Sequence, residues 1–175
     1  HAEIDLTDFV NESIENNGLG EYVKISYCGF DYFAYFNDDG TYEFNFDTDG
    51  AASMYEQVRE DFKKGITEYF EAMIEKNNAN ITVEELLESQ GKSLDALVEE
   101  EFSDDNLQSF MDSLSHEGNY ESKEGKLYLS DGLDTRPSKE VFEEYTLDGT
   151  TLTITAGNTK QSSEFDIFPL VFEKL

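Results

Sequence analysis

The fold of this chain is decided by a stretch that reads FDYFAYFNDDGTYEFNF, residues 30–46. Its two arms are rich in aromatic residues, which favour extended strands. The Asp-Gly pair at 39–40 between them is a hairpin signal, because Gly readily adopts the positive φ of a tight turn. The second arm alternates, with Tyr42, Phe44 and Phe46 on one face. The stretch therefore predicts an antiparallel hairpin with one aromatic face.

Further strand candidates lie on both sides of this hairpin. An alternating run at 3–6 and an aromatic run at 22–27 precede it. After residue 118, short strands alternate with turns that contain Gly; they span 119–122, 126–130, 142–147, 151–155 and 165–173. About eight strands of this kind can close into a barrel without exposed edges, with the last strand pairing with the first. Pro169 cannot donate a ladder hydrogen bond, so we expect it at an edge or a bulge.

Residues 51–114 carry a helical pattern instead. Their first apolar residues recur at spacings of three and four, which predicts one long amphipathic helix; they are Tyr55, Val58, Phe62, Ile66, Tyr69 and Met73. A capping box pairs a Ser or Thr with a Glu three residues later, and Ser53 with Glu56 fits that pattern at the start of this helix.

Capping signals also predict the starts of shorter helices. Thr82 with Glu85 is a second capping box, and Ser93 opens the next helix. The acidic run at 103–105 indicates a break followed by a new helix. Near the beginning of the chain, Thr7 can cap a short helix.

These patterns predict an α+β fold that is mainly antiparallel β. We expect a single domain over residues 1–175, built as an eight-stranded barrel with a helical insertion at about 51–114. The alternative is an open antiparallel sheet with the helices packed on one face.

The strand and turn pattern also resembles a known family. Residues 145–154 form a hairpin of the kind Y-x-L-x-G-x-x-L-x-I, and the runs 118–120, 125–129 and 168–174 fit the same frame, as does 39–42. In these features the chain resembles the lipocalin-like, calycin-type β-barrel domains of exported lipoproteins from Gram-positive bacteria. Such domains carry a Trp in their opening strand, whereas this chain has none.

The resemblance implies an extracellular or cell-surface bacterial protein and a lipocalin-like barrel, and it implies no particular ligand. The sequence begins at His1 without an initiator Met. We therefore leave open a signal or lipid anchor in a segment upstream of His1.

Charge restricts the partners that this chain can take. It has 40 acidic and 12 basic residues, a net charge of −28 and a pI near 4.1. Nucleic acids and anionic lipid surfaces attract Lys and Arg, so this charge argues against both. No apolar run is long enough for a membrane span. We expect a monomer, whose charged ligands or partners would be cationic.

No residue is assigned a catalytic, cofactor-binding or metal-binding role. The run Asn45, Asp47, Asp49-Gly50 and Glu56 has the spacing of a calcium-binding loop, but a strand precedes it where a helix would be required. We therefore interpret it as a turn, although calcium binding stays open.

Two further residues invite a chemical role. His116 is the only histidine besides His1, and we expect it to contact the end of a helix rather than to act in a catalytic triad. The single cysteine, Cys28, is expected to be a buried small apolar residue.

Three functional hypotheses remain. The preferred one is a non-enzymatic, exported, lipocalin-like protein that binds a small ligand or a partner. The alternatives are a hydrolase that uses paired carboxylates and a module whose acidic helices bind a basic protein.

Overall fold

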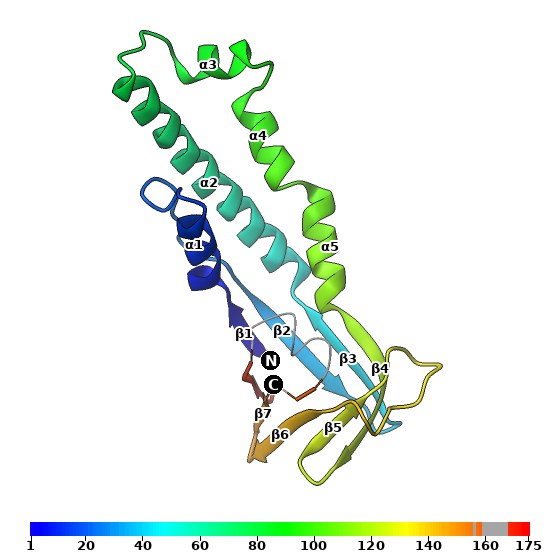
Figure 1. Cartoon of the computed structure of the whole chain (residues 1–175). Helices are drawn as coiled ribbons and strands as arrows, with labels where there is room; N and C mark the ends of the chain where they lie inside the picture. Colours follow the sequence, from blue (N-terminus) through cyan, green and yellow to red (C-terminus); the bar gives the residue numbers. More distant parts are fainter. Residues whose placement is uncertain (156, 159–167) are drawn as a thin grey trace. The chain divides into compact units, whose positions relative to one another are not determined.

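Eight antiparallel strands form one sheet in which every strand neighbours the next one along the chain (Figure 1). The structure is a computed structural model that describes residues 1–155, 157–158 and 168–175. The strands are β1 (Ala2–Asp5), β2 (Gly29–Phe36), β3 (Thr41–Phe46), β4 (His116–Lys123), β5 (Lys126–Leu129), β6 (Glu143–Asp148), β7 (Thr151–Thr155) and β8 (Leu170–Glu173).

The sheet curls into a nearly closed barrel. The backbone nitrogen of His1 donates to the Glu173 carbonyl at 2.9 Å, and the Glu173 amide donates to the His1 carbonyl at 2.8 Å. The first and last strands therefore meet, as the strand count predicted. This confirms the α+β barrel with a helical insertion and excludes the open sheet. The helical segment between β3 and β4 runs from residue 48 to residue 114.

Two compact units can be described separately. The barrel unit contains His1–Ile4, Phe30–Asp47 and Met111–Leu175, and the helical unit contains Asp5–Gly29 and Thr48–Phe110.

The hairpin of residues 30–46 forms the aromatic wall of the barrel unit. Gly40 has a φ of +86° in the turn, and Phe44 pairs with Ala34 across the two strands. Tyr42, Phe44 and Phe46 are all buried, which confirms the predicted face. The Phe44 ring lies 5.8 Å from Tyr32 and 6.2 Å from Phe172 in stacked arrangements, so β2, β3 and β8 share one aromatic core.

The described residues form five helices: α1 (Thr7–Asn16), α2 (Thr48–Lys76), α3 (Val83–Ser89), α4 (Leu94–Glu101) and α5 (Asp104–Leu114). The capping box of Thr82 and Glu85 is complete, because each side chain accepts a hydrogen bond from the other residue's backbone N–H. Ser93 caps α4 by accepting from the Ala96 amide, as predicted. None of the described helices has both the length and the apolar character needed to cross a bilayer.

Two predicted helix caps were wrong. Ser53 lies inside α2, which begins at Thr48, so its pairing with Glu56 is not a capping box. Thr7 is the first residue of α1, and its hydroxyl accepts a hydrogen bond from the Cys28 amide instead of capping the helix. The carboxylate of Asp5 takes over at that end by accepting from the Thr7 amide at 2.9 Å.

The aromatic run 22–27 is also not a strand. The Asn11 side chain both donates to the Ile25 carbonyl and accepts from the Ile25 amide, each at 2.9 Å, which satisfies that backbone without a neighbouring strand. The run packs against α2 at Gly65, where a Cβ would lie 2.5 Å from the Cα of Val23. The barrel still has eight strands, because β1, β2 and β3 are followed by the five strands β4 to β8, which match the five runs predicted for that part of the chain.

The last predicted strand is confirmed where it can be described. β8 spans Leu170–Glu173, and Pro169 immediately precedes it, so no ladder hydrogen bond is required from the proline. The predicted start of this strand, at 165–167, lies outside the described residues.

Candidate functional site

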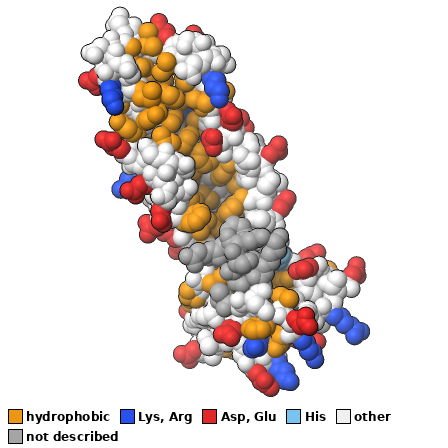
Figure 2. All heavy atoms as spheres, viewed as in Figure 1, with side chains coloured by type: hydrophobic (Ala, Val, Ile, Leu, Met, Phe, Trp, Pro, Cys, Tyr) orange, Lys and Arg blue, Asp and Glu red, His pale blue; other side chains and the backbone are white. Residues whose placement is uncertain are grey.

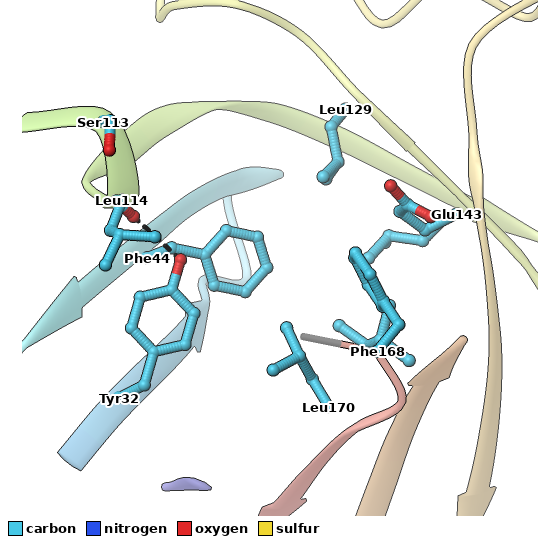
Figure 3. Close-up of a pocket in the computed structure, with 10 residues that line it drawn as sticks. Tyr32, Phe44, Ser113, Leu114, Leu129, Glu143, Phe168 and Leu170 are labelled. Atoms are coloured by element: carbon cyan, nitrogen blue, oxygen red, sulfur yellow. Dashed lines mark hydrogen bonds between the residues drawn. The ribbon is translucent and has the colours of Figure 1, made fainter. Parts of the chain in front are cut away.

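The candidate site is a small cavity inside the barrel unit (Figure 3). Its volume is about 20 Å³, which is room for about one water molecule. The side chains that line it come from six strands, from the end of α5 and from the residue before Pro169; they are Tyr32, Phe44, Ser113, Leu114, Leu127, Leu129, Glu143, Ile154, Phe168 and Leu170. Most are apolar, so the cavity is a low-dielectric environment.

One carboxyl group reaches into these apolar surroundings. Glu143 is the first residue of β6 and is 2% exposed. Leu127 pairs with it across the β5–β6 ladder. Figure 3 shows Glu143 and Phe168 on one side of the cavity, with Tyr32 and Leu114 on the other. Carboxyl groups are rarely buried without a partner, so the contacts of Glu143 need to be accounted for.

The environment of Glu143 changes its acidity. Burial raises the pKa of this carboxyl to about 7, although a hydrogen bond from the Gly157 amide acts in the opposite direction. The amide nitrogen of Gly157 lies 2.5 Å from Oε2 of Glu143. A carboxyl with this pKa changes its protonation state near neutral pH, which is a property often found at functional sites.

Tyr32, across the cavity, has a structural role. Its hydroxyl donates to the Leu114 carbonyl at 2.8 Å, and burial raises the pKa of the phenol. The hydroxyl is therefore held neutral and anchors the end of α5 to the barrel wall.

A second buried polar side chain, Ser130, is also structural. Its hydroxyl accepts from the Asn119 amide at 2.8 Å and lies 2.9 Å from the Gly132 carbonyl, to which it donates. These bonds tie the loop after β5 to β4. Tyr42 donates to the Ser130 carbonyl at 2.9 Å, and burial raises the pKa of Tyr42 to about 12.

The two histidines have separate partners. His116 lies just after α5, and its Nε2 is 3.1 Å from the Ser113 carbonyl in the last turn of that helix, as predicted. His1 pairs with Asp31 at 2.8 Å.

Cys28 is buried, as expected, with its Sγ 3.7 Å from the Sδ of Met54. Burial, followed by the charge of Asp5, raises the pKa of the thiol. A raised pKa keeps the thiol protonated and poorly nucleophilic at neutral pH.

The calcium-like run begins in β3 and ends in α2. The Asn45 amide donates to Glu43 at 2.7 Å, and Glu56 pairs with Arg59 at 3.3 Å. Asp47 precedes α2, whereas Asp49 lies in its first turn. Among the described residues, no group of three His, Cys, Asp or Glu side chains is arranged to hold a metal ion.

Glu143 was missed by the sequence analysis. Glu143 alternates in phase with Tyr145 and Leu147 in the predicted strand 142–147. That alternation does not mark a buried face, because Tyr145 is half-buried and Leu147 is exposed, so the sequence carried no clear signal for Glu143.

Comparisons with protein-family models, curated proteins and solved structures gave no match to this chain. The lipocalin-like resemblance therefore stays a prediction from the strand pattern, and the function is a matter for proposal.

Proposed function

We propose that the chain is a non-enzymatic, lipocalin-like protein whose barrel binds a small apolar ligand bearing an amine or another cationic group. The observation that carries the proposal is Glu143, a carboxyl with a pKa near 7 in an otherwise apolar cavity. A cation that reaches this carboxylate would be attracted to its buried charge. The apolar lining would accept the rest of the molecule.

The cavity must enlarge to admit a ligand. The cavity holds about one water molecule, and Phe168 is only half-buried while most of the apolar lining around it is buried. We infer that the Phe168 ring moves aside when the ligand enters. Phe168→Ala should therefore improve the binding of any apolar ligand, charged or neutral.

The test compares n-octylamine, n-octanol and octanoate by calorimetry at pH 8 in 150 mM salt. The amine should bind more tightly than the alcohol, and octanoate should bind least. Glu143→Gln should weaken octylamine binding about tenfold, because a charge-assisted contact is lost, and should leave octanol unchanged. Glu144→Gln removes an exposed carboxyl from the next position and should change neither ligand.

Two results would count against this proposal. One is the absence of octylamine binding, both in the native chain and in Phe168→Ala. The other is an equal loss of affinity in Glu143→Gln and Glu144→Gln, which would indicate attraction to the acidic surface alone.

We also propose export to the cell surface, supported by the family resemblance of the strand pattern. The reading frame upstream of His1 tests this part. A leader peptide, with or without a lipid-modifiable Cys, is expected there, and a cytoplasmic domain in its place would contradict it.

The carboxylate hydrolase remains the alternative. It would require a second carboxyl beside Glu143, and the described side chains that line the cavity include no other.

A further inference from the structure

The helical unit contains a polar groove, formed by residues 7–11 of α1, the segment 22–26 and residues 61–68 of α2. Its volume is about 640 Å³, which is within the range of roughly 300 to 1,000 Å³ that is typical of sites for small ligands. Every residue that lines the polar groove belongs to the helical unit, and none of them lines the barrel cavity.

Hydrogen bonds hold the three parts of the groove together. The Asn11 side chain of α1 makes two bonds with the Ile25 backbone, each at 2.9 Å. The Ser26 amide and hydroxyl both donate to Oδ2 of Asp61 on α2, at 2.7 and 2.6 Å. The Gln57 amide donates to the other carboxylate oxygen of Asp61 at 2.9 Å. The groove is therefore preformed, so a ligand does not have to order its walls on binding.

Four charged side chains of the groove are available to a ligand. All four are exposed, and among the described residues none of them forms an ion pair: Lys24, Lys64, Asp8 and Glu68. Lys64 acts on Asp61 through its charge, but both oxygens of that carboxylate are already hydrogen-bonded. The available groups are thus two cations and two anions. The rest of the helical unit is mainly acidic, and Figure 2 shows mostly Asp and Glu among the charged side chains along it.

The two lysines of the groove differ from other basic residues of this unit. Because acidic residues far outnumber basic ones, a basic side chain readily finds an acidic partner. Three of them do so: Arg59 with Glu99 at 2.6 Å, Lys63 with Asp95 at 2.7 Å and Lys92 with Glu100 at 3.1 Å. Lys24 and Lys64 belong to different parts of the chain, yet both line the groove. A carboxylate placed between them would gain charge-assisted contacts that no described side chain supplies.

This combination of charges selects a ligand that carries both signs. A simple anion would be repelled by the two acids, and a simple cation would be repelled by the two lysines. A zwitterion can place its carboxylate between the lysines and its ammonium beside the acids. The half-buried ring of Tyr22 also lines the groove and offers an aromatic contact to the rest of the ligand. The volume of the groove favours a peptide of about three residues over a single amino acid.

We propose that the polar groove binds a short peptide with free ends. The C-terminal carboxylate of that peptide lies between Lys24 and Lys64, and its N-terminal ammonium meets Glu68 and Asp8. Capture of free peptide ends is an established mode of peptide recognition. This site lies within the helical unit and does not depend on ligand binding in the barrel unit.

The test uses the full chain and four forms of the tripeptide Ala-Phe-Ala, measured by calorimetry at pH 7 in 150 mM salt. The free peptide should bind with a Kd on the order of 100 µM. N-acetylation removes the ammonium and C-amidation removes the carboxylate, so each should weaken binding about tenfold. The doubly blocked peptide should bind about a hundredfold more weakly than the free peptide.

A matched pair of lysine variants locates the carboxylate. Lys64→Gln and Lys76→Gln each remove an exposed lysine from α2, but Lys76 lies outside the groove. Lys64→Gln should weaken the free peptide about tenfold and leave the C-amidated peptide unchanged, because that form has no carboxylate to lose a partner. Lys76→Gln should change neither affinity.

A matched pair of glutamate variants locates the ammonium. Glu68→Gln should weaken the free and the C-amidated peptide several-fold and leave the N-acetylated peptide unchanged. Glu75→Gln removes an exposed carboxyl of α2 outside the groove and should have no effect. Circular dichroism checks that all four variants keep the native helix content.

Any of three results would overturn the proposal. The first is no binding of the free peptide at millimolar concentration, and the second is equal binding of the free and the doubly blocked peptide. The third is an equal effect of Lys64→Gln and Lys76→Gln on the free peptide.

Discussion

Replacing Glu143 by Gln should stabilise the protein above neutral pH and should not stabilise it in acid. The folded carboxyl has a pKa of about 7, compared with an ordinary value of 4.5 that we take for the unfolded chain. The folded state therefore binds the proton more tightly, so stability falls as the pH rises from about 4.5 to 7 and then levels off. Gln has nearly the same shape, cannot ionise and can still accept a hydrogen bond from Gly157.

The magnitude follows from the two pKa values. Between pH 5 and pH 8, titration of Glu143 should cost the native protein about 2.5 kcal/mol of unfolding free energy. A buried neutral amide carries its own cost of about 1 to 2 kcal/mol, which does not depend on pH. The variant should thus gain about 2.5 kcal/mol relative to the native protein on going from pH 5 to pH 8.

Urea unfolding measures this difference. Tyrosine fluorescence and circular dichroism can both follow the transition, since the chain has ten Tyr and no Trp. Other carboxylates titrate in the same range, but they cancel when the variant is compared with the native protein at each pH. Glu144→Gln provides the matched control and should show no such pH dependence. If the difference between Glu143→Gln and the native protein is constant from pH 5 to pH 8, Glu143 does not titrate as argued.

Three further substitutions test the packing of the helical unit. Gly65→Ala should lower the free energy of unfolding by about 2 kcal/mol in urea titrations, because the added Cβ would lie 2.5 Å from the Cα of Val23. Thr82→Ala should cost about 1 kcal/mol by the same measure, since it removes the cap of α3. Asp61→Asn should destabilise the protein at pH 7 and not near pH 2, as thermal melts can show. Burial acts to raise the pKa of Asp61, but hydrogen bonds, led by those from Ser26, lower it overall, so its contribution is lost as pH falls through the folded pKa.

Each of these substitutions has a simple control. For Gly65→Ala, the control is Ser53→Ala, which places an alanine at an exposed position of α2 and should change stability by less than about 0.5 kcal/mol. A similar loss at both sites would contradict the close approach at Gly65. Thr82→Ser keeps the capping oxygen and should preserve most of the stability. For Asp61→Asn, an equal loss at both pH values would mean that the carboxylate charge has no part in the effect.

The features that sequence predicted best are those with a local cause. The hairpin turn at 39–40 was predicted correctly because Gly40 itself readily adopts the positive φ that the turn requires. The cap at Thr82 was predicted correctly because Thr82 and Glu85, the two residues of the capping box, are only three positions apart. Ser53 with Glu56 has the same pattern, yet α2 begins five residues earlier, so a capping motif identifies a helix start only where no earlier turn continues the helix.

The features that sequence missed depend on distant partners. The run 22–27 has the composition of a strand, but its backbone is satisfied by the side chain of Asn11. Alternation does not distinguish a strand from an extended segment that lies on a helix. The sequence analysis missed Glu143 for a related reason. The sequence has 40 acidic residues, and only the register of β6 shows which one points inward.

The contrast between Ser130 and Glu143 separates architecture from function. Both side chains are buried, and both accept a hydrogen bond from a backbone amide. Ser130 connects β4 to the loop after β5 without carrying a charge, so its role in the fold is sufficient to explain it. A Gln of nearly the same shape at position 143 could still accept the hydrogen bond from Gly157, whereas the charge of Glu143 destabilises the folded state above neutral pH. The stability cost of this charge gives a physical reason to test the proposed cationic ligand first.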